Sequence, residues 1–99
     1  MKKLENILSG IQALKIVGSQ SIEIAGLAFD SRVVKKDYLF VATKGTLVDG
    51  HKFITKAISS GALCIICENL PQETDKNITY IQVNDSQECL GIIASNWYD

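Results

Sequence analysis

The fold is decided by residues 38–67, which read YLFVATKGTLVDGHKFITKAISSGALCIIC. The stretch begins with an apolar, aromatic-rich run over 38–42 and ends with a second compact apolar run over 63–67, and such runs are typical of buried strands. Between them lies a helical pattern whose apolar face consists of Phe53, Ile54, Ala57 and Ile58. Gly61 follows as a glycine of the kind that ends helices. This order predicts a βαβ unit, with two parallel strands joined right-handedly.

Apolar patterns upstream of this unit predict one helix and further strands. Helical spacing begins at Leu4 and continues to Leu14, and Gly10 can end this helix early. Residues 21–28 then alternate between polar and apolar, which predicts one or two short strands broken at Gly26.

Downstream of the unit, we expect a strand over 79–83 and a final helix. The helix begins with a capping box, because Asp85 can accept hydrogen bonds at its start and Glu88 stands three residues later. Its apolar face consists of Cys89, Leu90, Ile93, Ala94 and Trp97. The whole pattern predicts a single three-layer α/β domain over residues 1–99, with a mixed β-sheet flanked by helices.

The composition is that of a globular protein and excludes several functions. The 99 residues carry ten Lys and Arg against eleven Asp and Glu, which gives a net charge of -1. The chain therefore lacks the excess of positive charge expected of a protein that binds nucleic acid or anionic membranes. No apolar run approaches the roughly 20 residues that span a bilayer. We therefore expect a cytoplasmic protein with no nucleic-acid and no membrane partner.

Three cysteines, an odd number, fit a reducing compartment better than a disulfide scaffold. Cys64 and Cys67 form a C-x-x-C pair, but their flanks predict a strand, in which residues three apart point to opposite faces. The two thiols would then be too far apart for a disulfide, and the chain offers no second ligand pair at zinc spacing. We expect the cysteines to be small apolar core residues and the chain to hold no metal.

Gly45 and Gly50 flank a loop between a predicted strand and a predicted helix, the place where a phosphate-binding P-loop would lie. A P-loop continues with Lys and then Ser or Thr, whereas His51 and Lys52 follow here. ATP hydrolysis at this loop is therefore not expected. Two interpretations remain open: contact of the loop backbone with an anionic ligand, and a tight turn before a helix capped by Asp49.

Asp30, Ser31 and Arg32 combine a carboxylate, a hydroxyl and a guanidinium, which suits a binding turn. The alternative is a strand-terminating turn in which Asp30 and Arg32 pair with each other or with Asp49. His51 is the only histidine. Its place in the first turn of a helix disfavours a charged imidazolium, so we expect a structural or capping role for it rather than catalysis.

These motifs resemble the N-terminal domain of the Mur ligases of peptidoglycan synthesis. The resemblance is carried, in one continuous order, by Asp30-Ser31-Arg32-x-Val34, Leu39-Phe40-Val41-Ala42, Gly45-x-x-x-Asp49-Gly50-His51-x-Phe53-Ile54 and Ala57-Ile58-x-x-Gly61-Ala62. One departure is Lys36-Asp37-Tyr38, where the family has a glycine before its Asp-Leu-Phe, and it concerns the geometry of that turn. The family's central ATPase domain, with its P-loop, and its C-terminal domain are expected to lie outside this chain.

The resemblance implies that the domain holds the UDP end of UDP-N-acetylmuramoyl-dipeptide. The stretches 67–71 and 81–98 are similar to the ligases that use ATP to add the third residue of the peptide stem to UDP-N-acetylmuramoyl-L-alanyl-D-glutamate. Ligases that add the terminal dipeptide have a similar opening domain and remain an alternative. A stand-alone, non-catalytic nucleotide-binding or regulatory module is a further alternative.

The resemblance also implies which residues hold the UDP group. The contacting residues would be Phe29, Ser31, Thr46, Leu47 and Val48. The supporting residues would be Asp30, Arg32, Asp49, Gly45 and Gly50. Recognition by the 46–48 loop would involve its backbone N–H groups as much as its side chains. No catalytic residue is expected here, because ATP and Mg²⁺ would bind to the remaining ligase domains of the full-length enzyme.

Overall fold

The fold is known from a computed structural model, which describes residues 1–45 and 48–98. Its elements, in chain order, are β1 (Lys2–Lys3), α1 (Leu4–Ile7), β2 (Lys15–Val17), β3 (Glu23–Ile24), β4 (Gly26–Ala28), the 3-10 turn η1 (Ser31–Val33), β5 (Tyr38–Val41), the 3-10 turn η2 (Gly50–Phe53), α2 (Ile54–Ser59), β6 (Cys64–Cys67), β7 (Thr79–Gln82) and α3 (Ser86–Tyr98).

Five of the strands form one sheet in the order β2-β7-β6-β5-β4. Strands β4 to β7 are parallel to one another, and β2 is antiparallel to β7, so the predicted mixed sheet is confirmed. Strands β1 and β3 pair separately as a small antiparallel ribbon. In the described ranges, no helix has the length and apolar character needed to cross a membrane.

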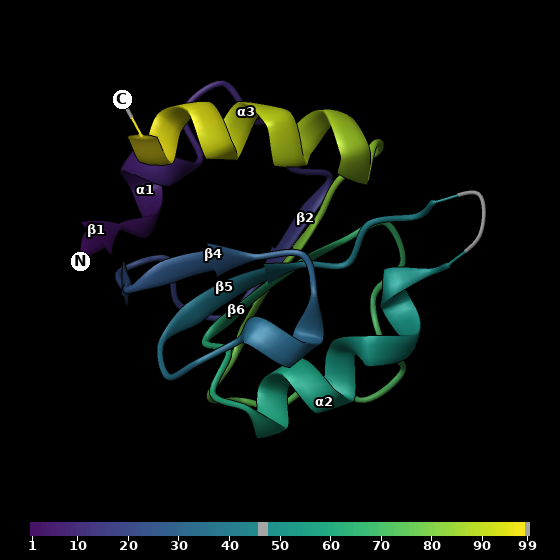
Figure 1. The fold of residues 1–99 in the computed structure, drawn as a ribbon. Helices are drawn as coiled ribbons and strands as arrows, with labels where there is room; N and C mark the ends of the chain where they lie inside the picture. The colour runs from purple at the N-terminus through teal and green to yellow at the C-terminus, as the bar shows by residue number, and fades with distance from the viewer. Residues whose placement is uncertain (46–47, 99) are drawn as a thin grey trace.

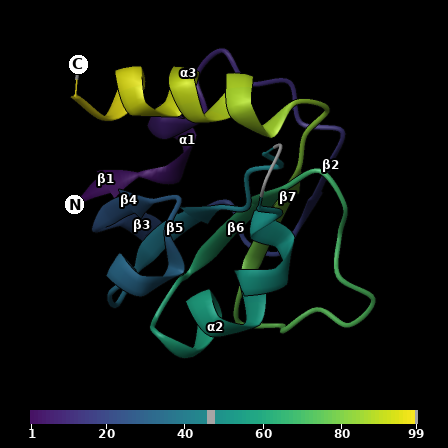
Figure 2. The ribbon, with the colours of Figure 1, turned by 45° about the vertical axis from the view of Figure 1, so that its right-hand side comes forward.

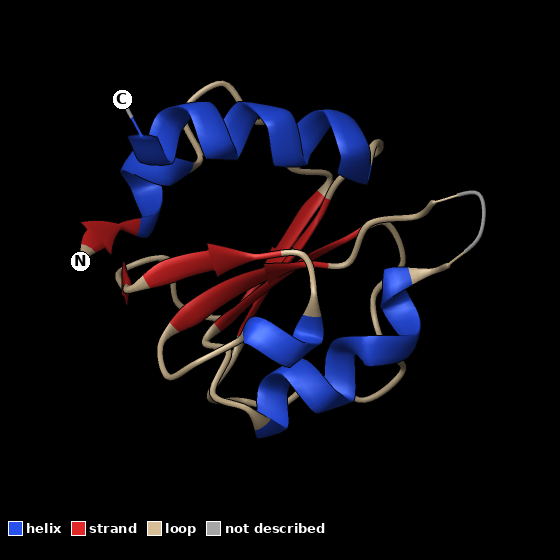
Figure 3. Cartoon of the chain, viewed as in Figure 1, coloured by secondary structure: helices blue, strands red, loops and turns tan. Residues whose placement is uncertain are grey.

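Helices cover both faces of this sheet, which confirms the three-layer architecture. Figure 1 and Figure 3 show α1 and α3 on one face and α2 with the 3-10 turns on the other, and Figure 2 shows the same layers after a rotation. Side chains along β5 and the residue after it point alternately to the two faces of the sheet. Leu39 and Val41 belong to the core under α1 and α3, whereas Phe40 and Ala42 belong to the core under α2.

The predicted βαβ unit is present as β5, α2 and β6, with Leu39 opposite Cys64 in parallel register. The helix between these strands does not begin at His51, which was expected in its first turn, because that turn is the 3-10 turn η2 and the α-helix begins at Ile54. Gly61 ends it with φ +116°, as predicted for a left-handed glycine.

The N-terminal helix ends early, as expected from Gly10, although the helical pattern continues to Leu14. Helix α1 ends at Ile7, Gly10 adopts φ +84°, and Leu14 is 63% exposed. The chain then forms β2, an edge strand that the apolar pattern did not predict. A three-residue strand with mixed side chains is too short to show a period-2 pattern. Its extended conformation is stabilised by pairing with β7.

The predicted break between residues 21 and 28 separates two strands that belong to different sheets. Strand β3 pairs with β1, whereas β4 pairs with β5. The break lies at Ala25, one residue before the predicted Gly26. Gly26 instead begins β4, where a Cβ atom would come within 2.6 Å of the Tyr38 ring. This glycine therefore serves close packing.

The cysteines lie where the strand pattern predicts. Cys64 packs in the core under α1 and α3, and Cys67 packs in the core on the opposite face of the sheet. All three cysteines are buried and free, and burial raises the pKa of the Cys67 and Cys89 thiols to about 11. Among the described residues, no group of three His, Cys, Asp or Glu side chains is placed to hold a metal ion.

The turn before β5 explains the departure from the family pattern. Asp37 adopts φ 65°, the left-handed conformation that glycine favours. Aspartate tolerates this region better than most residues, because its short side chain can bond locally. The chain therefore keeps the geometry of a glycine turn without the glycine.

We expect Asp37→Gly to stabilise the fold by about 0.5 kcal/mol. Relief of the left-handed strain is worth roughly 1–2 kcal/mol, and the greater freedom of the unfolded chain removes roughly 0.4–1 kcal/mol of this gain. Thermal unfolding monitored by circular dichroism should show a melting temperature about 2–4 °C higher. Lys36→Gly, next in sequence and without a positive φ, should lower it. A lower melting temperature for Asp37→Gly would contradict the prediction.

Candidate functional site

Two loops meet at the carboxyl edge of the sheet. Residues 29–32 directly follow β4, and residues 43–50 follow β5. Since β4 and β5 are adjacent and parallel, both loops leave the sheet at the same edge. Ligand sites in open α/β sheets favour this edge.

The first loop is braced by its own carboxylate. Asp30 caps η1 by accepting from the backbone N–H of Arg32 at 2.9 Å, and the Arg32 guanidinium binds the same carboxylate through Nε at 3.0 Å and Nη2 at 2.7 Å. These contacts lower the pKa of Asp30 to about 2. Asp30 thus pairs with Arg32, as the alternative of a strand-terminating turn expects, and Ser31 between them is 5% exposed.

The second loop is a small hairpin. Lys44 and Asp49 face each other in an antiparallel bridge. The N–H of Gly45 donates to the Val48 carbonyl at 3.1 Å, and the N–H of Gly50 donates to the Thr43 carbonyl at 2.7 Å. The N–H groups of the two glycines are thus bonded within the loop itself.

The bonds made by the two glycines also differ from those of a P-loop. A phosphate cradle needs free backbone N–H groups that converge on the anion, but those of Gly45 and Gly50 are used within the loop. A Cβ atom on Gly50 would lie 2.8 Å from the Thr43 nitrogen, so the absent side chain makes room for the loop's own backbone.

His51 joins the end of the hairpin to the end of β6. Asp49 caps η2, as predicted, by accepting from the His51 backbone N–H at 3.0 Å, and it lies 2.6 Å from the ring Nδ1. The other ring nitrogen, Nε2, accepts from the backbone N–H groups of Glu68 at 2.9 Å and Asn69 at 3.2 Å. The backbone contact from His51 is the main cause that lowers the pKa of Asp49. Such contacts fit the structural role expected for this histidine.

The two loops enclose an open hollow of about 490 Å³. It is lined by Phe29, Asp30, Ser31, Arg32, Thr43, Val48, Gly50, Phe53 and Lys56. Three large apolar side chains are exposed there: Phe29 at 62%, Val48 at 59% and Phe53 at 39%. Exposed aromatic rings can stack on a planar base, hydroxyls can hydrogen-bond its edge, and lysine can pair with phosphate.

The structure brings together most of the predicted site residues. Phe29, Ser31 and Val48 line the hollow, as do three of the supporting residues, Asp30, Arg32 and Gly50. Gly45 and Asp49 hold the hairpin instead of lining the hollow. Thr46 and Leu47 lie outside the described residues.

Three lining residues were not predicted: Thr43, Phe53 and Lys56. The helical pattern correctly places Lys56 away from the core, where it is exposed. That pattern carries no information about which neighbouring loop the side chain faces. Beside the paired Asp30 and Arg32, Lys56 leaves the hollow with one excess positive charge.

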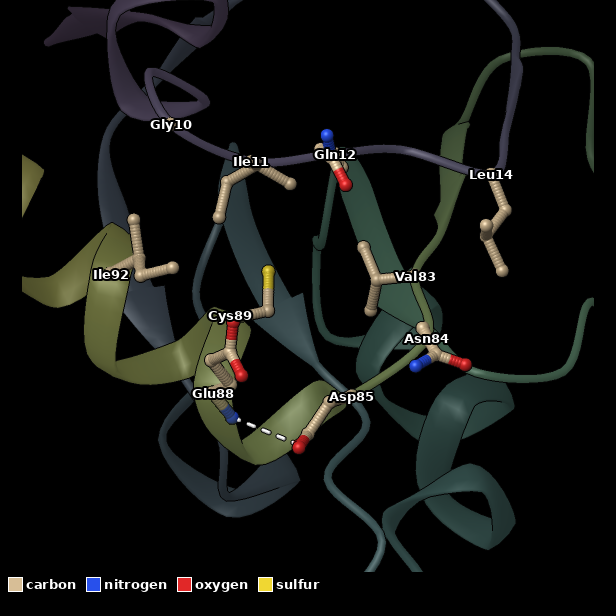
Figure 4. A pocket seen from close by; sticks show the side chains of 10 residues that line it. All are labelled: Gly10, Ile11, Gln12, Leu14, Val83, Asn84, Asp85, Glu88, Cys89 and Ile92. Carbon is tan, nitrogen blue, oxygen red and sulfur yellow. Dashed lines mark hydrogen bonds between the residues drawn. The ribbon is translucent and has the colours of Figure 1, made fainter.

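A second hollow, of about 410 Å³, lies between residues 10–14 and the start of α3. Figure 4 shows Ile11 and Ile92 beside Cys89, and the hydrogen bond from the Glu88 backbone to Asp85. This hollow carries two carboxylates and no lysine or arginine in its lining. Its negative charge is unsuited to an anionic ligand. The hollow between the two loops is therefore the better candidate for the UDP site that the resemblance implies.

Fold and hollow together define a small α/β domain suited to a ligand with a planar ring and a negative charge. The chain belongs to the Mur ligase family: the family described as "Mur ligase family, catalytic domain" matches residues 23–98. It is 47% identical over 96 residues to the UDP-N-acetylmuramoyl-L-alanyl-D-glutamate--2,6-diaminopimelate ligase of Phocaeicola vulgatus, a match that covers 97% of this chain and 20% of that protein.

Solved structures show the same fold. The UDP-N-acetylmuramoylalanyl-D-glutamyl-2,6-diaminopimelate--D-alanyl-D-alanyl ligase of Acinetobacter baumannii matches 96% of this chain and 21% of its own, with a TM-score of 0.76 at 21% identity. The MurF ligase of Thermotoga maritima, in complex with ADP, matches 69% of this chain and 15% of its own, with a TM-score of 0.59 at 34% identity. The chain thus spans about a fifth of the length of the curated relatives it matches.

Proposed function

We propose that this chain is the UDP-binding N-terminal domain of a ligase that adds the third residue to UDP-N-acetylmuramoyl-L-alanyl-D-glutamate in peptidoglycan synthesis. The observation that carries the proposal is the hollow between the two loops, in a chain that belongs to the Mur ligase family. The names of the curated relatives support diaminopimelate as the added residue. Three reduced cysteines support a cytoplasmic location.

In this proposal, the hollow holds the uridine diphosphate end of the substrate. Phe29 and Phe53 offer ring surface to uracil, and the Ser31 hydroxyl can donate to or accept from its edge. The ammonium of Lys56 neutralises charge on the diphosphate. The domain thereby anchors one end of the substrate, while the reacting carboxylate lies at the other end.

ATP and Mg²⁺ belong elsewhere in the full-length enzyme. The residues of this chain do not fit an ATP phosphate cradle, because the N–H groups of Gly45 and Gly50 are bonded within the hairpin and no Lys-Ser or Lys-Thr pair follows Gly50. The remaining ligase domains are therefore proposed as the partners that bind ATP, and this domain alone is proposed to be non-catalytic.

The alternative is a ligase that adds the terminal dipeptide. The structural similarity to such a ligase from Acinetobacter baumannii favours it only at the level of the fold, at 21% identity. Assaying the full-length enzyme with UDP-linked dipeptide and tripeptide acceptors separates the two. Phosphate release with the dipeptide acceptor supports our proposal, and release only with the tripeptide acceptor contradicts it.

Ser31→Ala tests the position of the nucleotide site. Loss of one neutral hydrogen bond removes on the order of 1 kcal/mol, so UDP should bind about fivefold more weakly. Titration of the ¹⁵N-labelled chain with UDP, followed by amide shifts in two-dimensional NMR, measures the dissociation constant. Ser95→Ala on the exposed face of α3 is the matched control and should bind UDP like the wild type. Equal affinity in both variants would place the uracil away from Ser31.

A further inference from the structure

The geometry points to His51 as a positioning residue, one that holds the 43–50 hairpin in the conformation that binds the substrate nucleotide. This inference rests on the proposed function and deepens it. His51 does not line the hollow. Its influence on binding would act through the hairpin, which contributes Thr43, Val48 and Gly50 to the lining.

The hydrogen bonds of His51 define one tautomer. Because Nε2 accepts from two backbone N–H groups, of Glu68 and Asn69, that nitrogen carries no proton. The proton is then on Nδ1, which donates to the Asp49 carboxylate. The imidazole thus fixes the last residue of the hairpin bridge to the backbone just beyond β6, and its side chain is only 14% exposed.

A second anchor holds the other end of the same hairpin. The N–H of Lys44 donates to the Ser86 hydroxyl at 3.0 Å, and that hydroxyl donates to Glu68 Oε2 at 2.7 Å. Both anchors therefore end on Glu68, one on its backbone and the other on its side chain. The hairpin is tied at Lys44 and at Asp49, and between these ties only the bridge and turn bonds of the hairpin itself are present in the described residues.

Removing one tie should leave the protein folded but let the hairpin leave its binding conformation. Apparent affinity scales with the fraction of molecules in the competent state, so a hairpin that is competent about a tenth of the time binds about tenfold more weakly. A purely structural role would instead lower stability and leave the affinity of the folded protein unchanged.

The test measures UDP affinity and thermal stability in parallel on the 99-residue chain. We expect His51→Ala to weaken UDP binding about tenfold at a temperature where the variant is folded. His51→Gln can place its Oε1 near the position of Nε2 and accept the same N–H groups, so it should recover most of the affinity. The matched control is Asn96→Ala, which also removes two side-chain bonds to backbone, to the Ile7 and Ser9 carbonyls, but lies between α3 and the end of α1.

Asn96→Ala should lower the melting temperature without changing the affinity for UDP. If His51→Ala behaves in the same way, or if His51→Gln binds no better than His51→Ala, the inference is wrong while the proposed function stands. If His51→Ala does not fold, His51→Gln decides alone: wild-type affinity together with wild-type hairpin shifts supports the inference, and weakened affinity contradicts it. A wild-type chain that shows no shifts with UDP would overturn both the proposed function and this inference.

Discussion

Replacing Gly61 by alanine should lower the free energy of unfolding by about 3 kcal/mol, because a conformational strain and a steric clash add. Gly61 has φ +116°, where an L-residue is strained by roughly 1–2 kcal/mol. The new Cβ atom would also lie 2.7 Å from Lys36 Cα and 2.8 Å from Lys36 N. Backbone atoms cannot rotate away, and overpacking of this kind typically destabilises by about 1–3 kcal/mol.

The position of Gly61 explains why the effect should extend beyond the helix end. Its carbonyl accepts from the Asp37 N–H at 2.8 Å, so the end of α2 and the turn before β5 pack backbone to backbone. A shift that relieves the clash would move both ends of the βαβ unit. Urea unfolding at constant slope measures the change in free energy directly.

Gly91→Ala is the matched control for this prediction. Gly91 lies inside α3, and a Cβ atom there would meet nothing within 4 Å. Alanine is favoured over glycine in a helix interior by about 0.8–1 kcal/mol, so this variant should be more stable than the wild type. The same substitution should thus act in opposite directions at the two sites. A Gly61→Ala variant as stable as the wild type would show that the turn can adapt.

Glu68→Ala should destabilise the fold by about 2–3 kcal/mol, because it leaves buried donors at the start of α3 without their acceptor. Glu68 Oε2 accepts from the Ser86 N–H at 2.9 Å and from the Ser86 hydroxyl at 2.7 Å. Ser86 is fully buried, so its N–H and hydroxyl depend on this carboxylate for an acceptor. A carboxylate beside a helix N-terminus is also favoured by the helix dipole.

The pH dependence of stability identifies this carboxylate. Hydrogen bonds from the Ser86 backbone and hydroxyl lower the pKa of Glu68 in the folded state. The stability that Glu68 contributes is therefore present above its unfolded pKa of about 4.3 and is lost as pH falls through the lower folded value. Asp30 and Asp49 also have lowered pKa values, so the measurement is the difference between wild type and variant.

That difference in unfolding free energy should be large at pH 7 and should shrink as the pH falls below about 4. Glu88→Ala, in the first turn of the same helix, is the control: its side chain is exposed, and the change should stay within about 0.5 kcal/mol. A Glu68→Ala effect that does not vary with pH would mean that the packing of the side chain, rather than its charge, matters.

The elements whose signals are local could be predicted from the sequence alone. The apolar runs 38–42 and 63–67, joined by a helical pattern, determined the βαβ unit and placed Cys64 and Cys67 on opposite faces. Asp30, Asp49 and Asp85 each accept a hydrogen bond from a backbone N–H two or three residues later. Donor, acceptor and turn preference all lie within a few residues in these cases, so the sequence contains the whole interaction.

Only the tertiary structure decided the interactions between distant segments. The strand Lys15–Val17 exists because β7 pairs with it. Lys56 joins the hollow because α2 lies beside the turn after β4, and Phe53 joins it from the end of η2. The ties from Lys44 to Ser86 and from His51 to Glu68 connect residues 42 and 17 positions apart. Local preferences act over a few residues, whereas these contacts depend on how the packed layers bring distant segments together. The periodicity of apolar residues along the chain does not specify which distant segments meet.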